Sequence, residues 1–596
     1  ILNPDGLARG TQRALEEFVK NLERQDVFVS FSLYSNRIPE ADIMIGTYDK
    51  SRLIRRLVDD GKLSLSKTRE AFDIQEIEFE GKNTLFVSGY DGQGLAYVLY
   101  ELAERVSSQS IINLVDPLSA EPALQIREVF NFFNNFHLDS VWFYDPNYWE
   151  AYFSLLARNQ INTFTLVFGY HNTNFLPFLP HFVSLPEYEE VTVEGISGEE
   201  LAKNQKALKT ITETAADYGI EFYLGIWQFK LDAGSHPFSL FQPGIRLTGL
   251  TPENSVEYTY LALKKLIADF PAISGFGIRR GDAEGEKSGL SEEFLLQTLG
   301  EVLAENGRDR KLRLLAGDFG QDTVEQLIAK GVPVYLSTKY GHNTLTLSSQ
   351  PPDLPRDSNR EQTRFFHEIW GCGSHRILLW GNPHYLRQLT EELKALGSQG
   401  LAVTPPLALK GFGDQPGQWS LLTPEHQYYT WEFERYWYFY TLVGRLSYNP
   451  KLPGEVLLRE FNRRFGRNGP AIIDLYHLAS EVLDIYLKFH DTGNTLESWP
   501  EIDTGGALDY YYRRPPADPD LFCSCHEYVN EYLSNKPSGR ITPETVAERL
   551  ENLGRIIVDK VRKELDLNLL RISALSEEWR MTLNDFSILG NLALFH

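Results

Sequence analysis

The sequence predicts an α/β protein built around a (β/α)8 TIM barrel, with a small α/β domain before it and a mostly helical domain after it. Eight apolar runs of four or more residues recur between residues 123 and 420, and amphipathic helical stretches separate most of them. Apolar strands that alternate with amphipathic helices indicate a parallel sheet covered on both faces, and eight such strands close into a barrel. We therefore predict domains at residues 1–122, 123–420 and 421–596.

The first domain combines short apolar runs with helical patterns. Its predicted strands and helices are 27–34, 41–48, 51–61, 74–81, 84–90 and 92–106. The fourth and fifth of these segments read as a hairpin, because only Gly81, Lys82 and Asn83 separate them. The glycines from Gly89 to Gly94 lack the spacing of a phosphate-binding loop, so we interpret them as a tight turn from strand to helix.

The barrel prediction depends on the count and order of the apolar runs. The predicted strands are 126–133, 162–169, 220–227, 275–280, 312–318, 333–339, 376–381 and 400–405. An open, doubly wound sheet is the alternative, but no glycine fingerprint follows the first strand. A closed barrel is therefore favoured.

The last domain is predicted to be largely helical. Residues 422–446 are rich in aromatic side chains at near-helical spacing, and 546–566 form a long amphipathic pattern. We interpret the aromatic stretch as core or as a subunit contact, which would allow a homodimer through this domain. The polar, proline-rich stretch 499–520 is long enough to reach across to the barrel mouth.

Composition excludes several classes of function. The net charge is -23 and no Lys/Arg-rich run occurs, so neither a nucleic acid nor an anionic membrane is an expected partner. Three cysteines cannot build a disulfide framework, no metal-ligand spacing appears, and no cofactor is predicted. The chain begins with Ile1 rather than Met, which favours a processed, periplasmic or secreted protein over a cytoplasmic one.

Polar and aromatic residues gather where the predicted strands end. In a barrel these ends converge on one pocket. The residues are Glu128, Asn131, Tyr170, His171, Asn172, Trp227, Gln228, Arg279, Arg280, Asp282, Glu284, Asp318, Lys339, Tyr340, His342, Asn343, Trp380, Asn382, His384 and Tyr385. Aromatic rings stack on the apolar faces of sugars, while amides and charged groups hydrogen-bond their hydroxyls, so this set predicts a carbohydrate site.

The acidic turn after the fourth predicted strand supplies a proton donor. The segment 275–289 reads GFGIRRGDAEGEKSG. Glycosidic cleavage needs a carboxylic acid to protonate the leaving oxygen, and the charge of Asp282 with partial burial would raise the pKa of Glu284 toward that role. The alternative is a solvated acidic turn that caps a helix beginning near Ser291.

This segment also carries a resemblance to a known family. RGDAEGEKSG, at 280–289, is similar to the segment of bacterial xylan α-1,2-glucuronidases of glycoside hydrolase family 67 that holds the general acid, which implies that role for Glu284. Residues 155–172 resemble the second-strand segment of that family and 334–343 its sixth-strand segment. More distantly, the domain order resembles that of family 115 glucuronidases and of the family 20 hexosaminidases.

The sequence departs from that family at the positions that activate water. The sixth-strand stretch 339–344 lacks the family's aspartate, and the predicted seventh-strand stretch 380–385 lacks its glutamate. The candidates for a base are then two carboxylates and two imidazoles. They are Asp318, Glu128, His342 and His384. Substrate-assisted catalysis by Asp282 with Glu284, as in β-N-acetylhexosaminidases, or a non-catalytic sugar-binding barrel, would also account for the loss.

The substrate prediction depends on two arginines. Strand alternation points either Arg279 or Arg280 into the mouth, where it would pair with a uronate carboxylate. The alternative is that both form structural salt bridges. His171 and His342 have an alternative as packing residues, and Trp227 and Trp380 as fillers of the barrel top. We predict a glycoside hydrolase acting on a plant or algal polysaccharide fragment, α-glucuronidase-like on a uronic-acid substituent.

Overall fold

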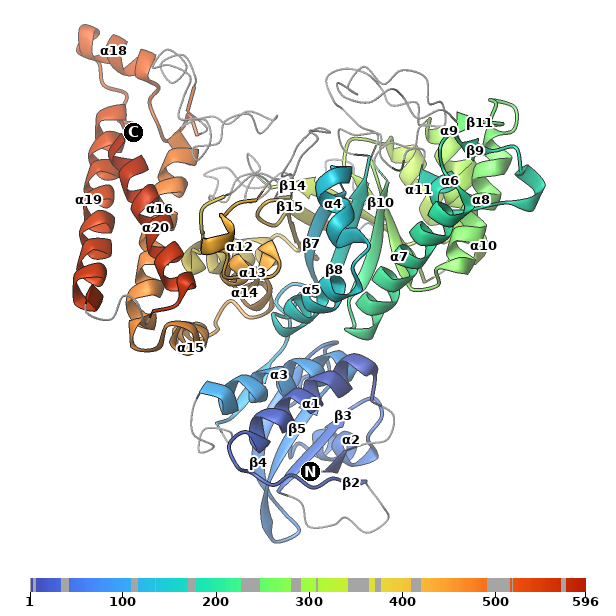
Figure 1. Cartoon of the computed structure of the whole chain (residues 1–596), viewed down its shortest axis with the longest axis horizontal. Coiled ribbons are helices and arrows are strands. Elements are labelled where there is room, and N and C mark those ends of the chain that lie inside the picture. The colour runs from blue at the N-terminus through green and yellow to red at the C-terminus, as the bar shows by residue number, and fades with distance from the viewer. Residues whose placement is uncertain are drawn as a thin grey trace.

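The computed structural model divides into three parts (Figure 1): an N-terminal α/β region, a barrel and a set of C-terminal helices. The structure describes residues 2–3, 7–33, 42–108, 116–133, 135–169, 175, 178–226, 247–279, 291–306, 309–340, 364–369, 377–408, 420–489, 515–516, 518–569 and 575–595. In Figure 1 the N-terminal region lies below the barrel, and the long C-terminal helices stand to one side of it.

The N-terminal region is a six-stranded sheet in the order β2-β1-β3-β5-β4-β6. Its elements are β1 (Leu2–Asn3), α1 (Arg9–Glu23), β2 (Ser32–Leu33), β3 (Ile43–Thr47), α2 (Arg52–Asp59), β4 (Phe72–Phe79), β5 (Lys82–Gly89), α3 (Gly92–Ser108) and β6 (Leu118–Ala120). Alternation along β3 and β5 separates two cores. Ile45 and Val87 join the core that includes α1 and α3, whereas Met44 and Phe86 pack with α2. The antiparallel pairing of β4 with β5 confirms the predicted hairpin.

Eight parallel strands close a barrel in the order β10-β12-β13-β14-β15-β16-β7-β8, which confirms the predicted fold class. The strands are β7 (Ile126–Phe133), β8 (Thr163–Phe168), β10 (Glu221–Ile226), β12 (Ile273–Ile278), β13 (Lys311–Leu315), β14 (Val334–Lys339), β15 (Arg364–Ile369) and β16 (Gly400–Val403). The short strands β9 (Thr192–Val193) and β11 (Leu247–Thr248) form a separate antiparallel pair.

The seventh barrel strand is not where the sequence predicted it. The strand is β15 (Arg364–Ile369), and the described part of the predicted segment, 377–381, has no strand structure. Leu379 in that segment is buried because C-terminal helices cover it, and its backbone N–H donates to Asp585 Oδ2 at 3.1 Å. The residues 377–381 are therefore apolar because they pack against helices, and not because they form a strand of the barrel.

Helices cover the outside of the barrel, as its apolar strands require. They are α4 (Phe136–Phe143), α5 (Pro146–Arg158), α6 (Phe178–Phe182), α7 (Gly198–Asp217), α8 (Ser255–Asp269), α9 (Glu292–Leu295), a π-helical turn (Leu296–Gly300), α10 (Glu301–Asn306), α11 (Gln321–Ala329) and α12 (Pro383–Ala395). Side-chain caps fix several of their starts. Ser197 and Glu200 form a capping box on α7, and Ser291 caps α9.

The C-terminal region is helical. Its longer elements are α14 (Trp437–Tyr448), α15 (Gly454–Phe465), α16 (Gly469–Phe489), α18 (Cys525–Ser534), α19 (Pro543–Asn568) and α20 (Glu577–Phe595). The aromatic stretch is core, since Trp437, Tyr438 and Phe439 are all buried. Within the described residues, no helix is long and apolar enough to cross a membrane.

Candidate active site

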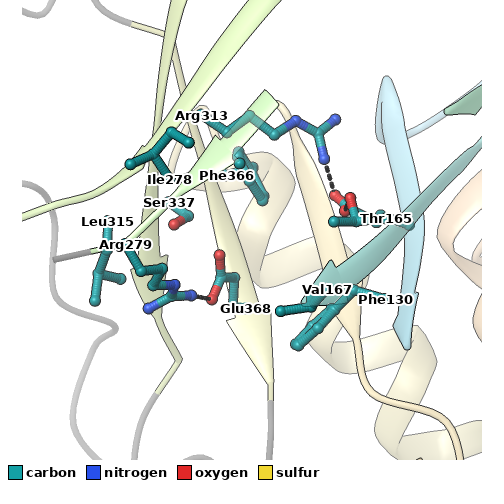
Figure 2. A pocket seen from close by; sticks show the side chains of 12 residues that line it. Phe130, Thr165, Val167, Ile278, Arg279, Arg313, Leu315, Ser337, Phe366 and Glu368 are labelled. Carbon is teal, nitrogen blue, oxygen red and sulfur yellow. Dashed lines mark hydrogen bonds and ion pairs between the residues drawn. The ribbon is translucent and has the colours of Figure 1, made fainter. Parts of the chain in front are cut away.

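A cavity lies inside the barrel, among side chains that point inward from the strands (Figure 2). Its volume is about 40 Å³, room for one or two waters. The lining residues are Glu128, Phe130, Thr165, Val167, Gly277, Ile278, Arg279, Arg313, Leu315, Ser337, Phe366 and Glu368. Arg279 and Glu368 come from the carboxyl ends of β12 and β15, the end at which barrels of this class hold their sites.

The first charged pair of the cavity joins Arg279 to Glu368. The Arg279 Nη2 donates to Glu368 Oε2, and Figure 2 shows the two side chains facing one another. The pair reaches across β13 and β14, which separate β12 from β15 in the barrel. Both side chains keep a small exposed fraction, 11% for the arginine and 10% for the glutamate. The carboxylate therefore remains at an accessible wall of the cavity.

The second pair, Arg313 with Glu128, spans the barrel. Glu128 accepts from Arg313 Nη1 and from the hydroxyl of Thr165. The guanidinium lies over the rings of Tyr223 and Phe366, at 3.5 and 4.9 Å from the ring centroids. Burial raises the pKa of Glu128 above its usual value, although the neighbouring arginine opposes that shift. Because β13 and β7 lie opposite one another, this pair crosses the barrel. It stands nearer the starts of its strands than Arg279 and Glu368 do, so we call it the floor pair and Arg279 with Glu368 the upper pair.

A glycine keeps the cavity open. A Cβ at Gly277 would meet nothing nearer than the Cα of Gly225, at 3.8 Å. Both glycines lie on the strand pair β10–β12, where they are register partners. A longer side chain at position 277 would therefore project into free space, and its absence leaves room beside the charged pairs.

Ten of the residues predicted for the site lie outside the described residues. They are Glu284, Asp282, Arg280, Tyr170, His171, Asn172, Trp227, Gln228, His342 and Asn343. Their roles stay predictions from the sequence.

Eight other predicted residues are described and do not line the cavity. They are Asn131, Asp318, Lys339, Tyr340, Trp380, Asn382, His384 and Tyr385. Tyr340 is fully buried with its hydroxyl donating to Glu392 Oε2 of α12 at 2.8 Å, so it faces a helix. Trp380 packs against Tyr385 and Phe439.

Asn382 and His384 belong to the start of α12. Asn382 is the N-cap, whose side chain accepts from the backbone of Tyr385, and His384 is exposed on the first turn. The prediction that Trp380, Asn382 and His384 follow the seventh strand is wrong, because that strand ends at Ile369.

Asp318 and Lys339 are half-buried near the strand ends. Asp318 lies in the turn after β13, where its backbone N–H donates to Leu315 O at 3.1 Å. Lys339 is the last residue of β14 and the register partner of Glu368. Neither side chain is among those that line the cavity.

The sequence reasoning missed Glu368, Arg313, Thr165 and Ser337. The signal for Glu368 was present in RFFHEI, residues 364–369, where alternation places positions 364, 366 and 368 on one face. The expectation that no acid stands at the seventh strand is wrong, because Glu368 is the penultimate residue of β15. Among the described residues, no cluster of three or more His, Cys, Asp or Glu side chains is arranged to hold a metal ion.

Fold and site together define a closed parallel barrel with arginine-paired carboxylates in a cavity among its strands. No family model matches the chain, and no curated protein matches its sequence. Among the solved structures that share the fold are two that are glycoside hydrolases by their titles. The first, a "GH138 enzyme targeting pectin rhamnogalacturonan II", is 16% identical with a TM-score of 0.71, covering 100% of this chain and 69% of that one. The second, the structure of CpGH84B, is 13% identical with a TM-score of 0.50, covering 100% and 87%.

At these identities the likeness shows a common fold. Neither of these two structures belongs to family 67, so the resemblance to that family stays a prediction from the sequence.

Proposed function

We propose that this protein is a glycoside hydrolase whose reacting carboxylate stands beside the cavity, at the carboxyl ends of the barrel strands. The observation that carries the proposal is Glu368, a carboxylate on the cavity wall at the carboxyl end of a barrel strand. Glycosidases need two carboxyl groups with different roles, one acid and one base or nucleophile. Two of the solved structures that share this fold are glycoside hydrolases, which supports the same assignment.

Glu368 is proposed as the base or nucleophile and Glu284 as the general acid. A guanidinium beside a carboxyl group favours its ionised form, which is the form that a base or nucleophile requires. Arg279 provides that charge to Glu368. Glu284 keeps the acid role that the sequence motif implies.

The proposed substrate is a plant cell-wall oligosaccharide that bears a uronic acid. One structural neighbour is titled as acting on pectin rhamnogalacturonan II, and Arg279 and Arg313 both line the cavity. Arginine pairs with carboxylates through two parallel hydrogen bonds, which suits a uronate. Each arginine already has a glutamate partner, so a uronate would have to share the guanidinium with Glu368 or Glu128.

The decisive experiment combines Glu368→Gln with a panel of substrates. The wild-type protein is expected to release reducing sugar from pectic oligosaccharides or from aryl uronides, and the variant to lose at least about 10²-fold in kcat/KM. Glu392→Gln is the matched control, because Glu392 lies on α12 outside the barrel and accepts from Tyr340. Its activity should equal that of the wild type.

Three results would contradict parts of the proposal. Hydrolysis of aryl N-acetylhexosaminides in place of uronides would favour substrate-assisted catalysis. Binding of oligosaccharides without release of reducing ends across the panel would indicate a sugar-binding protein. Full activity of Glu368→Gln would remove Glu368 from the mechanism.

A larger side chain at the cavity wall gives an independent test of whether the reaction takes place beside the cavity. Gly277→Val places its Cβ 3.8 Å from the nearest atom, the Cα of Gly225, and its two methyl groups beyond it. The variant should fold with a Tm near that of the wild type and lose activity. Retained activity would locate the reaction elsewhere in the barrel.

A further inference from the structure

The ion pair between Arg279 and Glu368 fixes the direction in which the proposed catalytic carboxylate points. The backbone of Glu368 is fixed on both sides. It lies in register with Lys339 of β14 and Ala402 of β16, and its carbonyl accepts from the N–H of Tyr340 at 3.0 Å. With the main chain held in this way, the direction of the carboxylate is set by what it meets inside the cavity. One partner there is the guanidinium of Arg279.

A second carboxylate shares the same cavity. Glu128 and Glu368 both line it, and the charge of Glu368 contributes to raising the pKa of Glu128. Two like charges in one cavity oppose each other's ionisation unless each has a cation. Here each has its own, Arg313 for Glu128 and Arg279 for Glu368, while Lys339 stands beside Glu368 in the neighbouring strand. The floor pair is almost fully enclosed, with 6% and 4% of its side chains exposed, whereas the upper pair is more open.

We propose that Arg279 is a positioning residue that orients Glu368 at the cavity wall and reserves it, as a charged carboxylate, for attack or for activation of water. This inference rests on the proposed function and adds to it the residue that orients the catalytic carboxylate. It differs from the expectation that Arg279 binds a uronate, because here the guanidinium acts on the enzyme's own carboxylate. Catalysis then depends on Arg279 through Glu368, without direct contact with the reacting atoms.

Steady-state kinetics of Arg279→Ala and Arg279→Lys test the inference. A misplaced catalytic carboxylate costs on the order of 10²-fold in rate, so Arg279→Ala should lower kcat by about that factor and leave KM within a few-fold of wild type. Arg279→Lys should recover part of kcat, because it restores the charge without the planar fork. Guanidinium chloride at millimolar concentration should raise the kcat of Arg279→Ala.

Arg364→Ala is the matched control. Arg364 begins the same strand that carries Glu368, but its Nη1 donates to the hydroxyl of Tyr335, on β14, at 2.6 Å. Its kcat should equal that of wild type and should not respond to guanidinium. A rise in KM with unchanged kcat for Arg279→Ala would overturn the inference and assign the arginine to substrate binding. A loss of kcat that neither lysine nor guanidinium restores would assign it a structural role only.

The failure of this inference is distinguishable from the failure of the proposed function. If the wild-type protein hydrolyses no glycoside in the panel, the proposed function is wrong and the positioning role falls with it. If the wild type is active and Arg279→Ala keeps its kcat, only the positioning role is wrong. A double-mutant cycle of Arg279→Met and Glu368→Gln adds a readout without substrate. The shift of the urea midpoint in the double variant should be smaller than the sum of the two single shifts.

Discussion

Two buried arginine–glutamate pairs, built on consecutive residues of one strand, differ in how completely they are hydrogen-bonded. Arg127 and Glu128 are neighbours on β7 and point to opposite sides of the barrel wall. Arg127 faces the N-terminal region and pairs with Glu70, while Glu128 faces the cavity and pairs with Arg313. Of these two pairs, one therefore joins the barrel to the N-terminal region and the other lies in the candidate site.

The outer pair is saturated. The Arg127 guanidinium donates to Glu70, to the carbonyls of Gln160 and Leu124 at 2.6 and 2.7 Å, and to the hydroxyl of Tyr97 at 3.2 Å. Glu70 also accepts from Asn162 Nδ2 at 2.9 Å. This network fixes the N-terminal sheet against the end of the barrel where the strands begin.

The inner pair is not saturated in the same way. The Nε of Arg313 is buried and has no hydrogen-bond partner among the described residues, and the guanidinium lies between aromatic rings beside a cavity. A buried ion pair alone is weak evidence for either stability or function. Arg435 and Arg445, which form ion pairs elsewhere, also have a buried Nε without a partner among the described residues, so the unused donor alone does not mark a site. The difference between the inner and outer pairs is that the inner pair lines the cavity and the outer pair does not.

The largest effect is expected at the saturated pair. Arg127→Met should lower the free energy of unfolding by about 3–5 kcal/mol, because it leaves the Glu70 carboxylate buried without its cation. Arg127→Met with Glu70→Gln should remain destabilised, since the carbonyls of Leu124 and Gln160 still lose their donor. Urea unfolding followed by tryptophan fluorescence measures both variants. A double variant as stable as the wild type would contradict the structural reading of this pair.

A fall in pH should lower the free energy of unfolding through His367, the neighbour of Glu368 on β15. His367 is buried on the outer face of β15, with Nδ1 at 2.9 Å from Ser398 Oγ, and burial lowers its pKa to about 4. A histidine with a lowered folded pKa stabilises the fold above its unfolded pKa of about 6.5, and that contribution is lost as the pH falls toward 4. The loss amounts to about 3 kcal/mol at pH 4.

Unfolding of His367→Gln between pH 7 and pH 4 checks this expectation. The variant should lose less stability over that range than the wild type, because glutamine does not titrate. His384→Gln is the control, since His384 is exposed on α12. Identical pH dependence of wild type and His367→Gln would show that the neutral ring is not required.

The smallest effect on stability is expected at the cavity floor. Arg313→Met with Glu128→Gln removes both charges together, and Gln keeps an oxygen for the hydroxyl of Thr165. Such paired replacement is often neutral, so the free energy of unfolding should change by less than about 1.5 kcal/mol while kcat/KM on the active substrate falls. If the free energy of unfolding falls as far as in the Arg127 and Glu70 double variant, the two pairs do not differ in their contribution to stability.

Much of the fold was predictable because its signals are local. The hairpin of β4 and β5 and the helices around the barrel follow from periodicity and turn residues within windows of about 10–20 residues. The barrel followed from the count of eight, although one counted run, 376–381, is not a strand in its described part and β15 takes its place. For the site, Glu128 and Arg279 were among the residues expected at the strand ends, and both line the cavity, although the sequence left open whether Arg279 or Arg280 points inward.

The sequence by itself determined that eight apolar strands alternate with helices and that charged residues stand at their ends. Only the tertiary structure decided that residues 364–369 close the barrel while the equally apolar 377–381 lie under α16 and α20, held by Ser480 and Asp585. An apolar run records that a segment is buried, but its partner lies about 100 to 200 residues away in the chain and leaves no local pattern. For the same reason the sequence does not show that Arg279 pairs with Glu368 and Arg313 with Glu128, because the closed barrel brings these residues together from distant parts of the chain.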